Sequence, residues 1–144
     1  MQDSSFAQSA VRHLQDAQTL LDQGRFDNAV YLSGYVPECA FKTLVQLYMD
    51  QRAAREYGHM LSEIQGVAMD RLRILFPEVD IRLPKSRLDG TVLVDGHPER
   101  RYARSGIWIE EQAMQAVARA WDLFEETIVE LVLDGKLSSE ELRG

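Results

Sequence analysis

The side chains best suited to chemistry lie near the middle of this 144-residue chain, where two arginines precede a histidine. Six residues separate Arg52 from His59, and Arg55 lies between them. An imidazole can transfer a proton near neutral pH, and a guanidinium can bind a phosphate through charge-assisted hydrogen bonds. Together they suit metal-independent cleavage of RNA. Alternatively, His59 caps or packs at a helix start while the arginines are solvated, which the residues alone favour.

Other patterns that would point to an enzyme are missing from the sequence. No three histidine, cysteine or carboxylate residues have the spacing of a zinc site, and no GxxxxGK[ST] or GxGxxG run is present. We therefore expect neither a metal nor a cofactor. His13 and His97 are expected to be solvated, and Cys39 to be a buried small apolar residue. Glu38 is either a functional carboxylate or the partner of Lys42, four residues further along a helix.

The composition is that of one folded domain covering 1–144. Hydrophobic residues make up 45% and charged residues 27% of the chain. With a single cysteine, no apolar run of about twenty residues and no secretory pattern at the N-terminus, we expect a cytoplasmic protein without a membrane segment.

The net charge of −7 is unevenly distributed. Residues 1–51 carry three bases and six acids, and residues 105–144 carry three bases and nine acids. Residues 52–104 carry ten bases and eight acids, so the middle third is slightly basic. The acidity argues against general affinity for polyanions, and any polyanion is expected to bind the middle third. The alternative is that this segment is simply solvated.

Helical periodicity predicts the elements that position these side chains. Apolar residues recur at helical spacing over four stretches, at about 5–22, 28–49, 60–75 and 107–134. Gly24 and Gly135 suit helix ends, and Asp27 is expected to cap the second helix. Pro37 is expected to kink that helix.

The segments that follow the last two helical stretches, at 77–104 and 138–142, have different patterns. Residues 138–142 are expected to form a capped final turn. Turn signals at 77–104 favour a small hairpin or a long excursion, and the pattern does not choose between them. The sequence thus predicts an all-α, antiparallel, four- to five-helix up-and-down bundle with an irregular insertion at about 77–104.

Residues 24–44, GRFDNAVYLSGYVPECAFKTL, resemble the HEPN domain family. Family members commonly show a Gly-Arg helix end, an aromatic residue and a helix with the pattern Ala-x-Tyr-x-x-Gly-Tyr-x-x-Glu-Cys-x-x-Lys. The segment Tyr57-Gly58-His59-x-Leu61 and the pair Arg101-Tyr102 look like two further elements of the family. Pro37 departs from the pattern, in which alanine or another apolar residue is usual.

The resemblance implies a four- or five-helix bundle that forms a homodimer, and it implies one of two activities. Many members are metal-independent ribonucleases of toxin or defence type, with a motif like Arg52 and His59. In that role Arg52 would stabilise the scissile phosphate, and His59 would serve as general acid or base. However, Ala53 stands where the nuclease motif usually has a polar residue, and the motif precedes the third helix instead of lying nearer the last.

The other implied activity is that of an accessory module beside a small nucleotidyltransferase, and we rank it first. On this hypothesis the chain binds a nucleotide or RNA and has no transferase residues of its own. The expected binding residues lie in the three family-like segments or within two residues of them: Tyr35, Glu38, Arg55, Tyr57, Arg101 and Arg104, with His59 in the same groove. The alternative is that the tyrosines simply pack the bundle, with their hydroxyls hydrogen-bonded at its edge.

Overall fold

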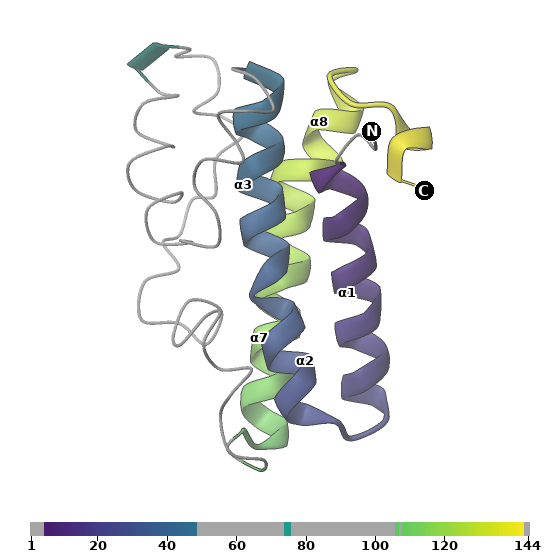
Figure 1. Ribbon diagram of the computed structural model, residues 1–144, viewed down its shortest axis with the longest axis vertical. Helices are drawn as coiled ribbons and strands as arrows, with labels where there is room; N and C mark the ends of the chain where they lie inside the picture. Colours follow the sequence, from purple (N-terminus) through teal and green to yellow (C-terminus); the bar gives the residue numbers. More distant parts are fainter. Residues whose placement is uncertain (1–4, 49–73, 76–105, 107, 143–144) are drawn as a thin grey trace.

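Among the residues that the computed structural model of this protein describes, three helical rods lie side by side (Figure 1). The structure describes residues 5–48, 74–75, 106 and 108–142. Figure 1 shows that the first rod runs antiparallel to the second, whereas the second and third run in the same direction. The first rod is α1 (Phe6–Asp22), and the second comprises α2 (Phe26–Ser33) and α3 (Tyr35–Tyr48). The third comprises α7 (Glu110–Phe124), the π-helix η4 (Glu125–Val129) and α8 (Glu130–Leu133). The 3₁₀ turn η5 (Ser139–Leu142) follows the third rod.

Helix α1 has the boundaries that the sequence predicts. At its start the hydroxyl of Ser5 accepts a hydrogen bond of 3.2 Å from the backbone N–H of Gln8, which would otherwise lack a partner. At its end Gly24 has a φ of +76°, a conformation that costs little without a Cβ. The N–H of Arg25 then donates to the carbonyl of Leu20, which closes the helix end.

The second rod differs from the single kinked helix expected over 28–49. The chain is interrupted at Gly34 and not at Pro37, which lies in the first turn of α3. The proline has no N–H to donate to the carbonyl of Ser33, and its ring would crowd that carbonyl, so the break falls next to Ser33. Gly34 keeps right-handed helical angles, with φ −67° and ψ −24°, so the two helices form one nearly continuous rod.

Asp27 does not cap the second helix as predicted. Helix α2 begins at Phe26, with Arg25 in the cap position, which places Asp27 in the first turn. The Asp27 carboxylate instead accepts hydrogen bonds from the backbone N–H groups of Gly106, at 2.6 Å, and Trp108, at 3.1 Å. This contact joins the start of the second rod to the chain just before the third.

The third rod begins at Glu110, three residues later than predicted. Gly106 has a φ of +82°, and Ile109 is extended, with φ −93° and ψ 165°, so the chain leading into the rod is not helical. The π-helical turn at Glu125–Val129 was not predicted, but Thr127 and Ile128 within it are buried, so the apolar face continues through it. Gly135, with a φ of +73°, follows the rod as expected.

The rods pack through a core rich in alanine. Seven alanines are fully buried, and their small side chains allow close approach of the helix axes. Phe41, Leu14 and Leu44 are the largest of the fully buried side chains. The core alanines are Ala10, Ala17, Ala29, Ala40, Ala113, Ala116 and Ala120. The predicted final turn is present at Ser139–Leu142, where the Ser138 hydroxyl accepts from the Glu140 N–H.

The all-helical prediction is confirmed for the described part of the chain, where every regular element is a helix. Within that part, no helix has the length and apolarity needed to cross a membrane. The predicted helix at 60–75, apart from 74–75, and the insertion at 77–104 lie outside the described residues. The count of four or five helices therefore stays a prediction.

Candidate functional site

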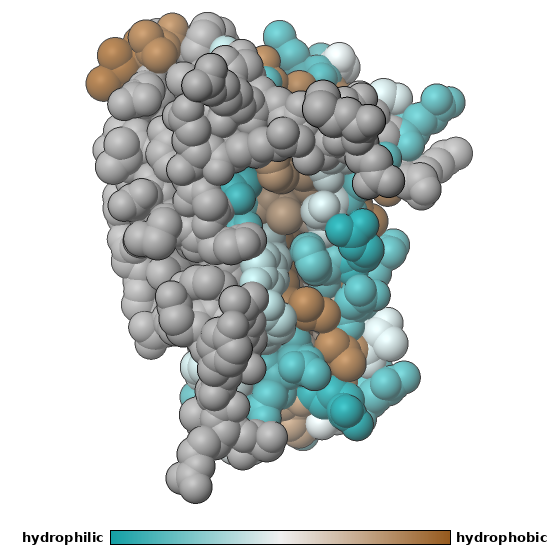
Figure 2. Space-filling model, in the orientation of Figure 1, coloured by the Kyte–Doolittle hydropathy of each residue, from teal (hydrophilic) through white to brown (hydrophobic). Residues whose placement is uncertain are grey.

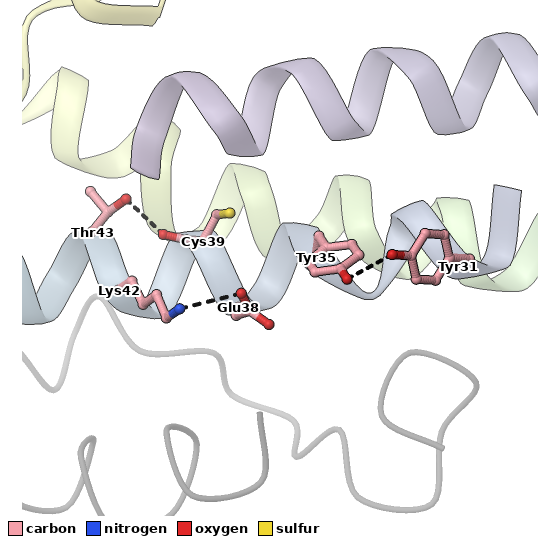
Figure 3. Close-up of polar contacts among 6 residues, drawn as sticks. All are labelled: Tyr31, Tyr35, Glu38, Cys39, Lys42 and Thr43. Carbon is pink, nitrogen blue, oxygen red and sulfur yellow. Dashed lines mark hydrogen bonds and ion pairs between the residues drawn. The ribbon is translucent and has the colours of Figure 1, made fainter. Parts of the chain in front are cut away.

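Four polar side chains form a row along one side of the α2–α3 rod. Tyr31, Tyr35, Glu38 and Lys42 follow one another at spacings of four, three and four residues, which aligns them on one helical face. Because Gly34 keeps helical angles, the row continues across the break between the two helices. Figure 3 shows Glu38 and Lys42 on one side of α3, and Cys39 and Thr43 on the other.

The two tyrosines at the N-terminal end of the row contact each other and a residue of α1. Their hydroxyl oxygens are 2.8 Å apart, and their rings meet edge to face with centroids 5.1 Å apart (Figure 3). On the other side of Tyr35 the imidazole of His13 stacks with a centroid distance of 5.2 Å and an angle of 28°. Tyr35 is buried, whereas Tyr31 and His13 are half-buried. The cluster therefore has an edge that solvent can reach.

His13 was expected to be solvated, but the structure places it partly inside the bundle. Its half-buried ring packs between helices instead. The signal that could have found it is its spacing of seven residues from Phe6, whose ring also contacts the row. Composition alone could not reveal the contact, because the aromatic partner comes from a different helix.

Glu38 and Lys42 form an ion pair inside the bundle. Lys42 Nζ lies 3.3 Å from Glu38 Oε2, and the residues are only 6% and 3% exposed. Lys42 Nζ also lies 5.5 Å from the centroid of the Phe6 ring, within the range of a cation–π contact. The i, i+4 pairing is the one that the sequence analysis left open beside a functional role.

Cys39 is a buried apolar residue, as predicted. It is 6% exposed, and burial, together with the nearby Glu38 carboxylate, raises the pKa of its thiol to about 12. The thiolate is the reactive form of cysteine, so this side chain does not serve as a nucleophile at physiological pH. Thr43, on the same side of α3, uses its hydroxyl to donate to the Cys39 carbonyl.

The row can bind a polar ligand but has no groups arranged for nucleophilic attack. It offers the Tyr31 hydroxyl and the His13 imidazole at its half-buried edge, with the buried Tyr35 hydroxyl and an ion pair behind them. Within the described residues, no three carboxylate, histidine or cysteine side chains are placed to hold a metal ion. The chemistry at hand is therefore hydrogen bonding and ring stacking.

A separate pocket of about 390 Å³ opens where the α1–α2 turn approaches the chain leading into α7. This pocket was not predicted from the sequence, because its two walls come from segments about eighty residues apart along the chain. The hydrogen bonds of Asp27 hold those walls together. Its lining residues are Gly24, Arg25, Phe26, Asp27, Asn28, Gly106 and Trp108.

Of the predicted site residues, the structure describes Tyr35 and Glu38 and places both in the row. The other six, Arg52, Arg55, Tyr57, His59, Arg101 and Arg104, lie outside the described residues. The Arg52–His59 ribonuclease site therefore stays a prediction. Comparison of the chain with models of known protein families, with curated proteins and with solved structures finds no match.

Proposed function

We propose that this chain is a HEPN-like binding module that recognises a nucleotide or RNA at the row formed by Tyr31, Tyr35, Glu38 and Lys42, with His13 beside it. The observation that carries the proposal is the position of this row. The four residues all belong to the family-like segment at 24–44, and their spacing aligns them on one face of the α2–α3 rod.

The energetics of the row support a role beyond stability. A buried ion pair contributes little more to stability than apolar residues of similar volume, because desolvation offsets the attraction between the charges. Glu38 and Lys42 thus occupy positions where apolar side chains would serve the fold as well. Side chains that the fold does not require are candidates for binding.

The residues of the row differ in exposure, and we therefore propose different roles for them in binding. Tyr31 and His13 are half-buried, so their hydroxyl and imidazole are the groups that would contact a base or a ribose. Tyr35 is buried between them and would hold both in position through its hydroxyl and its ring. The Glu38–Lys42 pair would fix the next turn of α3.

The proposal extends to partners on the strength of the family resemblance alone. The module would act as a homodimer beside a small nucleotidyltransferase. The ribonuclease alternative would use Arg52 and His59 instead, and the experiment below distinguishes the two.

The test is a set of titrations with AMP, ATP, GTP and a short single-stranded RNA, followed by calorimetry and thermal unfolding. A ligand at a hundred times its Kd stabilises the folded protein by about 2.7 kcal/mol, which shifts the Tm measurably. We expect Tyr31→Phe and His13→Ala to weaken binding by about tenfold, since each removes one hydrogen-bonding group.

Matched variants supply the controls. Tyr48→Phe removes a hydroxyl from another half-buried tyrosine of the same rod, and Thr19→Ala truncates an exposed residue of α1; both should bind as the unmodified protein does. Equal binding by all four variants, or no binding by any of these ligands below about 1 mM, would refute the proposal. Cleavage of the RNA that His59→Ala abolishes would favour the ribonuclease instead.

A further inference from the structure

A stripe of apolar side chains faces solvent on the outer side of α7. Met114, Ala118 and Trp121 follow one another at spacings of four and three residues, so they share one side of the helix. Met114 is 54% and Trp121 37% exposed, and Ala118 is exposed between them. Tryptophan and methionine are enriched at the centres of protein interfaces. The small alanine leaves room between them for an apolar side chain of a partner.

Carboxylates surround this stripe. Glu110, Glu111, Asp122 and Glu125 flank it and are all exposed. From Glu110 to Leu133 the charged residues are six acids and one base, a net charge of −5. The ion pair found among the described residues, Glu38–Lys42, lies elsewhere, so these carboxylates have no cationic partner within that part of the chain.

The net negative charge of this part of the chain determines which kind of partner can bind there. RNA and anionic membranes would be repelled, because they carry the same sign of charge. A second copy using the same face in a twofold contact would oppose acids to acids. The complementary surface is a basic one that carries an apolar anchor. We propose that the acidic–apolar face, defined as Met114, Ala118 and Trp121 with their flanking carboxylates, docks a basic amphipathic segment of another protein.

This face is separate from the nucleotide row. Trp121 Nε1 donates to Gln18 Oε1 at 3.2 Å, which places the face against one edge of α1. His13 lies five residues before Gln18, so the two project about 140° apart around the helix axis. The helix α1 thus separates the two sites. If binding at one of these two sites is disproved, the proposal for the other site still stands.

The experiment uses the full chain and a fluorescein-labelled, 18-residue helical peptide of alternating Lys and Leu faces, followed by fluorescence anisotropy. We expect Met114→Glu to weaken binding at least about tenfold, and the double variant Glu111→Lys/Glu125→Lys to weaken it similarly. Raising NaCl from about 50 to 300 mM should weaken it several-fold, because the rim charges are exposed.

Two variants at matched positions outside the face are the controls. Ile74→Glu changes a residue that is 79% exposed, in the pair 74–75 that forms the brown group at the upper left of Figure 2. Glu140→Lys reverses an exposed charge on η5. Both should bind within about twofold of the unmodified protein.

Three results would overturn the proposal. The first is equal loss of binding in the control variants. The second is equal affinity for a peptide of the same charge in which Ala replaces Leu, since the apolar anchor would then have no role. The third is conversion of a dimer to a monomer by Met114→Glu, which would make a second copy the occupant.

Discussion

At the scale of single residues, the interior of this protein contains two charges and a thiol within one turn of α3. Glu38 and Lys42 form an ion pair at 3.3 Å, and Cys39, the residue after Glu38, projects about 100° away from it around the helix axis. Removing one member of such a pair leaves the other charge buried without compensation, which costs far more than the pair contributes. The row is therefore sensitive to single substitutions.

We expect Glu38→Gln to lower the free energy of unfolding by about 3 kcal/mol, because Lys42 would stay buried without its counter-ion. The double variant Glu38→Gln/Lys42→Met should recover most of that loss. Urea unfolding followed by circular dichroism measures both, with the exposed Glu125→Gln as a control expected within about 0.5 kcal/mol of the unmodified protein. A double variant as unstable as the single one would contradict the paired arrangement.

Cys39 should be unreactive in the folded protein. Its thiol pKa is raised to about 12 by burial and by Glu38, so the thiolate is scarce well above neutral pH. Ellman's reagent at pH 8 should therefore react with the single thiol only after denaturant is added. Rapid reaction of the native protein at that pH would show that the side chain is accessible and ionised.

At the scale of helices, the ends of the rods are set by contacts between segments as much as by local signals. Three buried hydroxyls, those of Ser33, Thr43 and Thr127, donate to the carbonyl four residues earlier, which satisfies them inside the helices. Figure 2 shows that the outer surface of α1 is largely hydrophilic, as expected for a helix with one buried face.

Asp27 is the clearest case of a contact between segments. Its carboxylate holds two backbone N–H groups that lie 79 and 81 residues away along the chain. We expect Asp27→Ala to lower the free energy of unfolding by about 2 kcal/mol, since hydrogen bonds to a charged group are stronger than neutral ones. Asp27→Asn should cost less, because one oxygen acceptor remains.

The neighbouring exposed residue supplies the control for that measurement. Asn28→Ala should change the stability by less than about 0.5 kcal/mol. Urea unfolding followed by circular dichroism measures the stability of both variants. Equal effects of Asp27→Ala and Asn28→Ala would mean that the contact adds nothing to stability.

At the scale of the whole molecule, the charge distribution sets which surfaces can meet. The strongly acidic outer face of α7 disfavours self-association through that helix, so the proposed homodimer would use another surface. The chain has a mass of 16.4 kDa.

Light scattering at micromolar concentration should report about 33 kDa, twice the mass of one chain. Met114→Glu should leave that mass unchanged, because the acidic–apolar face is not the dimer surface on this proposal. A mass of 16.4 kDa at that concentration would refute the dimer.

The sequence by itself determined which stretches of the described part are helical, because apolar spacing and helix-end glycines are local signals. It did not determine the break at Gly34 or the π-helical turn at Glu125–Val129. Residues 5–22 and the stop at Gly135 were predicted from those signals alone. It also predicted the burial of Cys39 from its place in an apolar helix, and it offered the pairing of Glu38 with Lys42 as one of two roles, because residues four apart are neighbours on one helical face.

Only the tertiary structure decided the contacts that join distant segments. The stacking of His13 on Tyr35, the anchoring of Gly106 and Trp108 by Asp27, and the pocket beside that anchor all need two elements brought together. Local propensity cannot specify which side chains meet across helices, because that depends on how the rods pack. The break at Gly34 has the same origin as the predicted kink at Pro37, since a proline disturbs the turn before it and not the turn after it.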